Sequence, residues 1–171
     1  LYAGIDPAGL FASDDRGGSW RDVPALNEHE TRGAWEPARG LFAVHSRCVD
    51  RLDPGHLVVA VSAGGVCCSD DAGASWTPAN EGVRAENLPV RFPVAGHNVH
   101  RVVMHPLDGQ RLYRQCYNGT YRSDDGGRAW HEISHANGAG GGPIGSPQLV
   151  AAGRVLGGEV QPALHVSQVR R

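Results

Sequence analysis

The stretch SDDRGGSW (residues 13–20) returns twice along the chain, as SDDAGASW (69–76) and SDDGGRAW (123–130). The second copy begins 56 residues after the first (69 − 13), and the third begins 54 residues later (123 − 69). A repeat of this length is typical of solenoids, propellers and arrays, in which one supersecondary unit stacks on the next. The sequence therefore predicts a repeated structural unit.

All three copies fit the pattern Ser-x-Asp-x-Gly-x-x-Trp, and each residue type suits a tight turn. The Ser hydroxyl and the Asp carboxylate can bond to neighbouring backbone N–H groups. Gly adopts the positive φ that such a turn requires, and Trp can bury a large surface at the start of the next strand. We expect these positions to be structural, with the tryptophans largely buried: Ser13, Asp15, Gly17 and Trp20; Ser69, Asp71, Gly73 and Trp76; Ser123, Asp125, Gly127 and Trp130.

Short runs of β-branched and aromatic residues flank each turn and predict strands. The pair Asn118-Gly119 is a strong hairpin signal between two of them. The first unit begins inside its second strand, at Leu1, and lacks the first strand. In the second unit we expect strands over 44–50, 57–62, 65–70 and 75–78, and in the third unit over 99–105, 111–117, 119–124 and 129–133.

With three such turns in phase, residues 1–133 resemble the Asp-box β-propeller family, also called the bacterial neuraminidase repeat (BNR) family. That family includes sialidases and sortilin-type receptors. The resemblance implies an all-β fold of four-stranded antiparallel blades, with the Asp-box turns away from the ligand face. A propeller needs about four to eight blades, and this chain shows about two and a half. We therefore expect an incomplete propeller that requires the remaining blades of a longer chain, or self-association.

The predicted blades divide the chain into unequal parts. Residues 1–43 hold the partial blade and a connection, residues 44–98 a full blade and a connection, and residues 99–133 the third blade. Residues 134–171 contain no further copy of the pattern, and their run ANGAGGGPIGSP is typical of a flexible linker. We expect a Gly-rich linker and an irregular tail with room for one or two strands.

The resemblance places the ligand face opposite the Asp-box turns, where the long connections 21–43 and 77–98 and the starts of the first strands lie. The dipeptide Val-His opens the first strand of both full blades, at 44–45 and 99–100. These imidazoles could bind a metal or an anion, or act as acid and base, but a hydrogen bond between blades is the favoured interpretation. The ligand-face candidates are His45, His97, His100, Arg47, Arg101, Trp35 and Arg91.

The sialidase members of the family imply an arginine triad that clamps a carboxylate, a Tyr–Glu pair and an acidic Asp. This set cannot be assembled here, because Arg91-Phe92-Pro93 has the wrong order for the family's arginine motif, and Arg47 and Arg101 are offset by one residue. Enzymatic activity stays open. We expect a non-catalytic binding or scaffold module for a protein, peptide or glycan. The alternative is a fragment of a sialidase-like glycoside hydrolase (exo-α-sialidase) whose catalytic residues lie mostly outside this chain.

Composition narrows the classes of partner. The net charge of −2 argues against nucleic acid, and no run approaches about 18 apolar residues, so we expect no membrane span. The cysteines lack metal-binding spacing, and His97, His100 and His105 share no face of a strand; we therefore expect no metal and no cofactor. Cysteine usage leaves the compartment undecided, with a cytoplasmic location slightly favoured.

Overall fold

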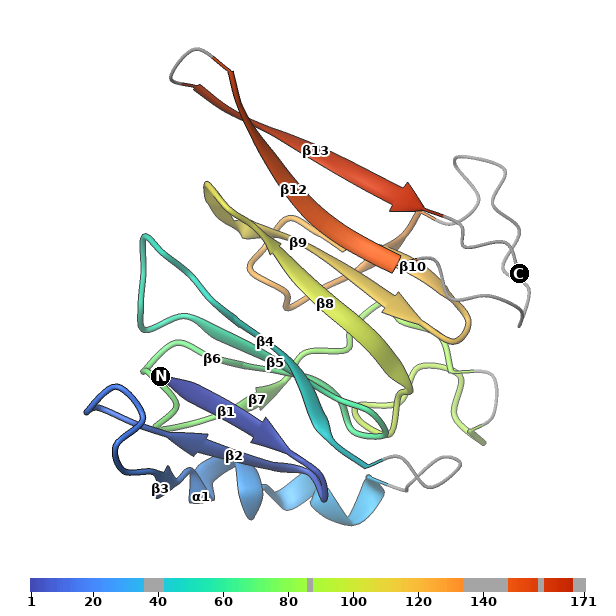
Figure 1. The fold of residues 1–171 in the computed structure, drawn as a ribbon. Coiled ribbons are helices and arrows are strands. Elements are labelled where there is room, and N and C mark those ends of the chain that lie inside the picture. Colours follow the sequence, from blue (N-terminus) through green and yellow to red (C-terminus); the bar gives the residue numbers. More distant parts are fainter. Residues whose placement is uncertain (36–41, 86–87, 134–147, 157–158, 168–171) are drawn as a thin grey trace.

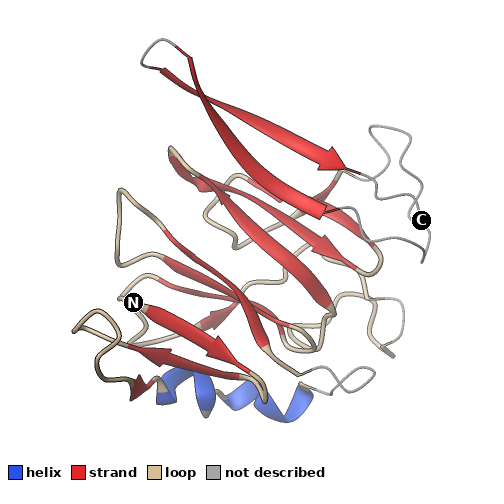
Figure 2. Ribbon diagram, viewed as in Figure 1, coloured by secondary structure: helices blue, strands red, loops and turns tan. Residues whose placement is uncertain are grey.

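The computed structural model describes residues 1–35, 42–85, 88–133, 148–156 and 159–167, and in the last two ranges it describes the backbone alone. Within these residues the chain is almost entirely β-structure (Figure 2). Three antiparallel sheets follow one another along the chain, and a β-hairpin comes after them (Figure 1). No helix of the described residues has the length and apolar character needed to cross a membrane.

Blades 2 and 3 are complete four-stranded sheets with the same strand order. In each, neighbours along the chain pair antiparallel. The predicted strands are confirmed, although the fourth is only two residues long in both blades. Blade 2 consists of β4 (Val44–Val49), β5 (Leu57–Val61), β6 (Gly65–Ser69) and β7 (Thr77–Pro78), and blade 3 of β8 (Val99–His105), β9 (Asp108–Cys116), β10 (Gly119–Ser123) and β11 (His131–Glu132).

Blade 1 has only three strands, β1 (Tyr2–Ile5), β2 (Gly9–Ala12) and β3 (Arg21–Asp22), and β1 forms one edge of its sheet. It lacks the strand that β4 and β8 supply in the other blades, as the sequence predicted. The connection to blade 2, expected to be a long loop, contains α1 (Pro24–Asn27) and the 3-10 helix η1 (Glu30–Ala34). Proline suits the first turn of α1 because its fixed φ is helical and it has no N–H to satisfy.

Two hydrophobic cores join the blades, one on each face of blade 2. The strand β5 reads LVVAV and is buried along its whole length. Leu57, Val59 and Val61 pack in the core shared with blade 1, whereas Val58 and Ala60 pack in the core shared with blade 3. Because side chains alternate along a strand, a strand covered on both faces requires an uninterrupted apolar run. Blade stacking therefore explains the apolar sequence of β5.

The exposure of each turn tryptophan depends on whether another blade packs against its own blade. Trp76 and Trp130 are 7% and 4% exposed, and each lies in the core shared with the preceding blade. Trp130 also donates from Nε1 to the carbonyl of Ala79 in blade 2, at 2.9 Å. Trp20 is 44% exposed, so the expectation that all three are largely buried is wrong for this residue. The physical reason is that no described blade precedes blade 1.

The tail contains two strands, β12 (Gln148–Leu156) and β13 (Glu159–Ser167), which pair as an antiparallel hairpin. The strand β12 contacts β8, much as β8 contacts β4 in the neighbouring blade (Figure 1). The Gly-rich linker expected over 134–147 lies outside the described residues. The described sheets do not close into a ring, and the fold is an incomplete propeller of antiparallel blades.

Candidate functional site

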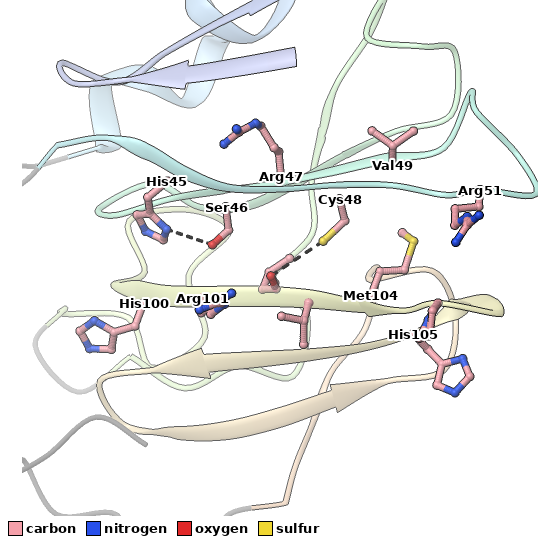
Figure 3. Close-up of a pocket in the computed structure, with 13 residues that line it drawn as sticks. His45, Ser46, Arg47, Cys48, Val49, Arg51, His100, Arg101, Met104 and His105 are labelled. Carbon is pink, nitrogen blue, oxygen red and sulfur yellow. Dashed lines mark hydrogen bonds between the residues drawn. The ribbon is translucent and has the colours of Figure 1, made fainter. Parts of the chain in front are cut away.

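A hollow of about 730 Å³ runs along β4 and β8, the first strands of blades 2 and 3 (Figure 3). Residues 45–49 and 100–106 line it consecutively. Because side chains on a strand alternate between two faces, a hollow that touches consecutive residues lies along the strand edges. Both strands are the edge strands of their sheets. We call this hollow the inner-edge groove.

A β-bulge at the same position redirects one histidine in each strand. In blade 2 the pairing of β4 with β5 skips His45, and in blade 3 the pairing of β8 with β9 skips His100. Bulges are frequent next to binding sites, where they aim a side chain in a new direction. The matched Val-His dipeptides therefore mark one structural position that is repeated in two blades, and both histidines line the groove.

His45 is held by two hydrogen bonds. Its Nε2 lies 2.8 Å from the carbonyl oxygen of Val99, and because a carbonyl only accepts, Nε2 is the donor. Its Nδ1 lies 3.1 Å from Ser46 Oγ. Partial burial lowers the pKa of the His45 imidazole, and the neighbouring His100 acts in the same direction. His45 thus ties blade 2 to blade 3 as a neutral side chain, through a hydrogen bond between blades.

His100 and His97, the other two candidate histidines, lie in different environments. His100 is exposed, although partial burial of its ring lowers its pKa. His97 is buried, donates from Nε2 to the Pro93 carbonyl at 2.9 Å, and lines a separate hollow of about 60 Å³. Burial, assisted by the charge of Arg114, lowers the pKa of His97 to about 4. Across the described part of the chain, no three His, Cys, Asp or Glu side chains gather as a metal site.

Arg47 and Arg101 occupy opposite faces of their strands. Arg47 pairs with Val59 on β5 and Arg101 with Gln115 on β9, and these two registers differ by one residue. Arg47 points from β4 toward blade 1 (Figure 3), where its Nε donates to the Tyr2 carbonyl at 2.8 Å. Because a one-residue offset reverses the strand face, the two guanidinium groups do not converge on a single carboxylate.

The inner-edge groove is basic. Its cationic and imidazole side chains come from both strands and the turns after them, and no Asp or Glu is among the described residues that line it. Arg51 and Arg101 are exposed and form no ion pair within the described residues. The groove's basic residues are His45, Arg47, Arg51, His100, Arg101 and His105.

Several arginines outside the groove are paired with carboxylates, although Arg16 and Arg91 are exposed and form no ion pair among the described residues. Arg84 lies 3.3 Å from Glu132, and Arg122 lies 2.7 Å from Asp124. Arg128 holds Asp70 at 2.6 Å, across the boundary between blades 2 and 3. The hydrogen bonds from His56 and then from Arg128 lower the pKa of Asp70. At these three places on the outer strands and turns charge is neutralised locally, whereas Arg51 and Arg101 in the groove have no carboxylate partner among the described residues.

Trp35 and Arg91 lie away from the groove. Trp35 is buried in the core between blades 1 and 2, where its Nε1 donates to Thr31 Oγ1 at 3.1 Å and the Arg32 guanidinium lies 5.3 Å from its ring. Arg91 is exposed and lies 5.5 Å from the ring of Phe92. Trp35 is a core residue in this structure, and Arg91 belongs to the connection that follows β7.

The three turns with the pattern Ser-x-Asp-x-Gly-x-x-Trp, which we call the repeat turns, share one hydrogen-bond network. In the second turn Ser69 Oγ donates to Asp71 at 2.8 Å and accepts from the Gly73 N–H, whose residue has φ +89°. Asp71 also accepts from the hydroxyl and N–H of Ser75, and these bonds lower its pKa to about 2. Equivalent bonds form in the first turn, and also in the third except that Ala129, in place of Ser75, donates only its N–H. Each carboxylate is therefore engaged by its own turn.

Sequence reasoning missed two arginines. Arg51 follows β4 and lines the groove, and extending the alignment of the Val-His strands would have drawn attention to it. Arg114 is fully buried, donates from Nη1 to Asn80 Oδ1 at 2.7 Å, and lies 5.7 Å from the Trp130 ring. Nothing in the run YRQC marks an arginine between two blades. Its burial depends on which face of β9 is covered, and the sequence alone does not give that.

Known proteins resemble this chain in three-dimensional structure. No family model matches it, and no curated protein matches it. Among solved structures, an ancestral GH74 enzyme is similar with a TM-score of 0.54 and 21% identity, covering 77% of this chain and 16% of the enzyme. The GH74 xyloglucanase from Xanthomonas campestris has a TM-score of 0.42 and 21% identity, covering 78% of this chain and 28% of that protein. The chain thus spans under a third of either enzyme, and what it shares with the ancestral enzyme is a propeller-type fold.

Proposed function

We propose that this chain is a non-catalytic binding or scaffold module of the Asp-box propeller type. Support comes from the repeat turns, which join the last two strands of every blade. Each turn uses its Ser and Asp side chains for its own backbone and hydroxyl groups. A turn of this kind holds two strands together, and the Ser and Asp of its pattern are engaged within the turn. The ligand is therefore bound elsewhere on the blades.

The inner-edge groove is the ligand site in this proposal. Its volume of about 730 Å³ lies within the range of ligand pockets. Glycoside hydrolysis typically needs two carboxyl groups on either side of the scissile bond, and no Asp or Glu is among the described residues that line the groove. That observation carries the proposal, because the described residues of the groove offer cationic and hydrogen-bonding groups for binding but no pair of carboxyl groups for glycoside cleavage.

Blocking the groove tests this function. A panel of peptides and oligosaccharides is screened against the chain by biolayer interferometry, and each binder is examined for cleavage by mass spectrometry. Arg101→Trp places a large ring in the groove, and the control Arg122→Trp places the same ring on β10, outside it. We expect affinity to fall at least about tenfold in the groove variant alone, as for obstruction of a central contact. A panel without binders, unchanged binding in Arg101→Trp, or a cleaved binder would contradict the proposal.

A second candidate is a fragment of a sialidase-like glycoside hydrolase whose catalytic residues lie mostly outside this chain. The ancestral GH74 enzyme, similar in fold, is the reason to test it. The chain, and a longer protein that contains it, would be incubated with sialyl-oligosaccharides and with xyloglucan. Sugar released by the longer protein alone would favour this candidate, and no release by either would count against it.

Both candidates require further blades, from a longer chain or from other copies. The edge position of β1 and the exposure of Trp20 support this part of the proposal, because they leave one face of blade 1 uncovered among the described residues. Light scattering at two protein concentrations tests self-association. Discrete oligomers would support it, and a monomer at both concentrations would contradict it.

A further inference from the structure

We infer that the inner-edge groove takes an extended acidic peptide, an inference that rests on the proposed function and names its ligand. The groove runs along β4 and β8, each the edge strand of its sheet, so it is lined by backbone as well as by side chains. On β8 the carbonyls of Val99 and Val102 already accept from His45 and Cys48, so a ligand would pair with the other groups of these edges. An unpaired strand edge presents N–H and C=O groups that a second strand can pair with. A peptide in extended conformation is the ligand that can use such an edge.

The length of the groove suits a short strand. β4 has six residues and β8 has seven. At about 3.3 Å per residue, they present an edge of roughly 20 Å. A peptide of six or seven residues would lie along that edge and bring every second side chain to the same face. The ligand is therefore a segment of a partner protein or a free peptide of that length.

The charge of the groove selects the side chains of the peptide. Arg51 and Arg101 are exposed without an ion pair in the described part of the chain, and Arg47 forms a hydrogen bond to a backbone carbonyl but no ion pair there. His100, beside Arg101, is also exposed. Carboxylates are the peptide groups that match guanidinium geometry. Because Arg47 and Arg101 occupy opposite strand faces, the arrangement fits several carboxylates along a chain better than one carboxylate in a clamp.

The lining also argues against a neutral glycan. Sugar rings are commonly held against aromatic side chains, and no Trp, Tyr or Phe lines the groove among the described residues. An acidic glycan or a nucleic acid would use the same arginines, but neither has the strand backbone that an edge can pair with. The combination of free strand edges and unpaired arginines therefore favours an acidic peptide over these two polyanions.

Fluorescence anisotropy with a matched pair of peptides tests the inference. The probe is a labelled nine-residue peptide that alternates Thr and Glu, and its control replaces each Glu by Gln. The protein variants are Arg51→Gln/Arg101→Gln in the groove and, as a control, Arg122→Gln on β10, whose partner is Asp124. An oligosaccharide derived from heparin and a single-stranded oligothymidylate serve as probes of the other two polyanion classes.

The expected result is binding of the Glu peptide that weakens at least about tenfold in the Gln peptide and in the double groove variant, as for the loss of close charge pairs. Arg122→Gln should bind as the wild type does, and added salt should weaken binding because exposed charges are screened. Equal binding of the Glu and Gln peptides, or binding of only the oligosaccharide or the oligothymidylate, would overturn the inference. A Glu peptide that is not bound would overturn it too.

The two proposals fail in different ways. If a panel ligand is lost in Arg101→Trp but is insensitive to Arg51→Gln/Arg101→Gln, the groove is a binding site that does not select acidic peptides. If no panel ligand responds to Arg101→Trp, the groove is not the ligand site, and the proposed function fails first. Circular dichroism of each variant shows that a loss of binding does not come from unfolding.

Discussion

The repeat turns and the inner-edge groove are both rich in polar residues, but the turns satisfy those groups internally and the groove does not. In the turns the Asp of each Ser-x-Asp pattern accepts hydrogen bonds from its own Ser and backbone, and near the third turn Arg122 and Arg128 are paired with carboxylates. In the groove, Arg51 and Arg101 are exposed without a carboxylate partner in the described part of the chain. The repeated motif therefore belongs to the scaffold, whereas the unpaired arginines of the groove are the basis of the binding site that we propose.

The comparison also separates two roles of histidine. His45 and His100 occupy the same bulge in consecutive blades. His45 donates a hydrogen bond from Nε2 to the Val99 carbonyl of the next blade, whereas the His100 side chain is exposed. The same position thus bonds to the next blade in blade 2 and is exposed in blade 3, where the proposed ligand would reach it.

The largest effect that we expect is a difference in unfolding free energy between alanine variants of two turn tryptophans, Trp130 and Trp20. Trp130→Ala should lower the free energy of unfolding by about 3–5 kcal/mol, because it empties a buried site between blades 2 and 3. Trp20→Ala should cost only about 1 kcal/mol, since the ring is already 44% exposed. Urea unfolding followed by circular dichroism measures both. Equal costs would mean that the blades do not stack as described.

The stability of the protein should depend on pH through His97, the buried histidine that lies outside the groove. The pKa of His97 falls from 6.5 to about 4 on folding, so the fold holds it neutral. Stability from this group is present above pH 6.5 and is lost as the pH falls toward 4, because the unfolded chain takes up the proton first. At about 1.4 kcal/mol per pKa unit, the loss is roughly 3 kcal/mol.

His97→Gln isolates that contribution. The variant keeps a donor near the Pro93 carbonyl but no longer titrates in this range. Urea unfolding at pH 7 and at pH 4 should show a smaller loss for the variant than for the wild type. The same pH dependence in both proteins would show that His97 does not carry it.

The next smaller effect is the loss of stability when the glycine of a repeat turn is replaced by alanine. Gly73 has φ +89°, and no side chain of the protein blocks a Cβ there. Gly73→Ala should therefore cost about 1–2 kcal/mol from backbone strain alone. The control Gly33→Ala, where nothing lies within 4 Å of the added Cβ, should change stability by about 0.5 kcal/mol or less. Thermal unfolding of the two variants tests the difference, and similar values would contradict a strained turn.

The smallest effect distinguishes an unpaired arginine from a paired one. Arg101→Gln should change the free energy of unfolding by less than about 0.5 kcal/mol, because it breaks no ion pair in the described structure. Arg128→Gln should cost up to about 1 kcal/mol, since it removes the 2.6 Å contact with Asp70. Urea unfolding at low ionic strength resolves these values. A cost at Arg101 equal to that at Arg128 would show that the groove arginine serves the fold.

The blades could be predicted from the sequence because the turn pattern and the apolar runs are local. The bounds of β8 agree with expectation, and LVVAV identified β5. The helices α1 and η1 were missed, because α1 is only four residues long and its Asn27 contacts β2 through a pair of hydrogen bonds with Leu10. Such a contact depends on tertiary structure and leaves no periodic signal in the sequence.

The candidate site was predictable only in part. The repeated Val-His dipeptide pointed to His45 and His100, and the structure brings both to one groove. The exposure of Trp20 and the burial of Trp35 were not predictable, because each depends on whether a neighbouring segment covers that face. The burial of Arg114 between two blades is a third case of this kind.

The exposure of Trp20 has a spectroscopic consequence. The chain contains four tryptophans, and Trp35, Trp76 and Trp130 are buried. Emission at the long-wavelength side of the spectrum should therefore come mainly from the solvated indole of Trp20. If another blade docks on the open face of blade 1, that emission should shift to shorter wavelength and iodide should quench it less. The native chain thus carries an intrinsic optical reporter of ring assembly.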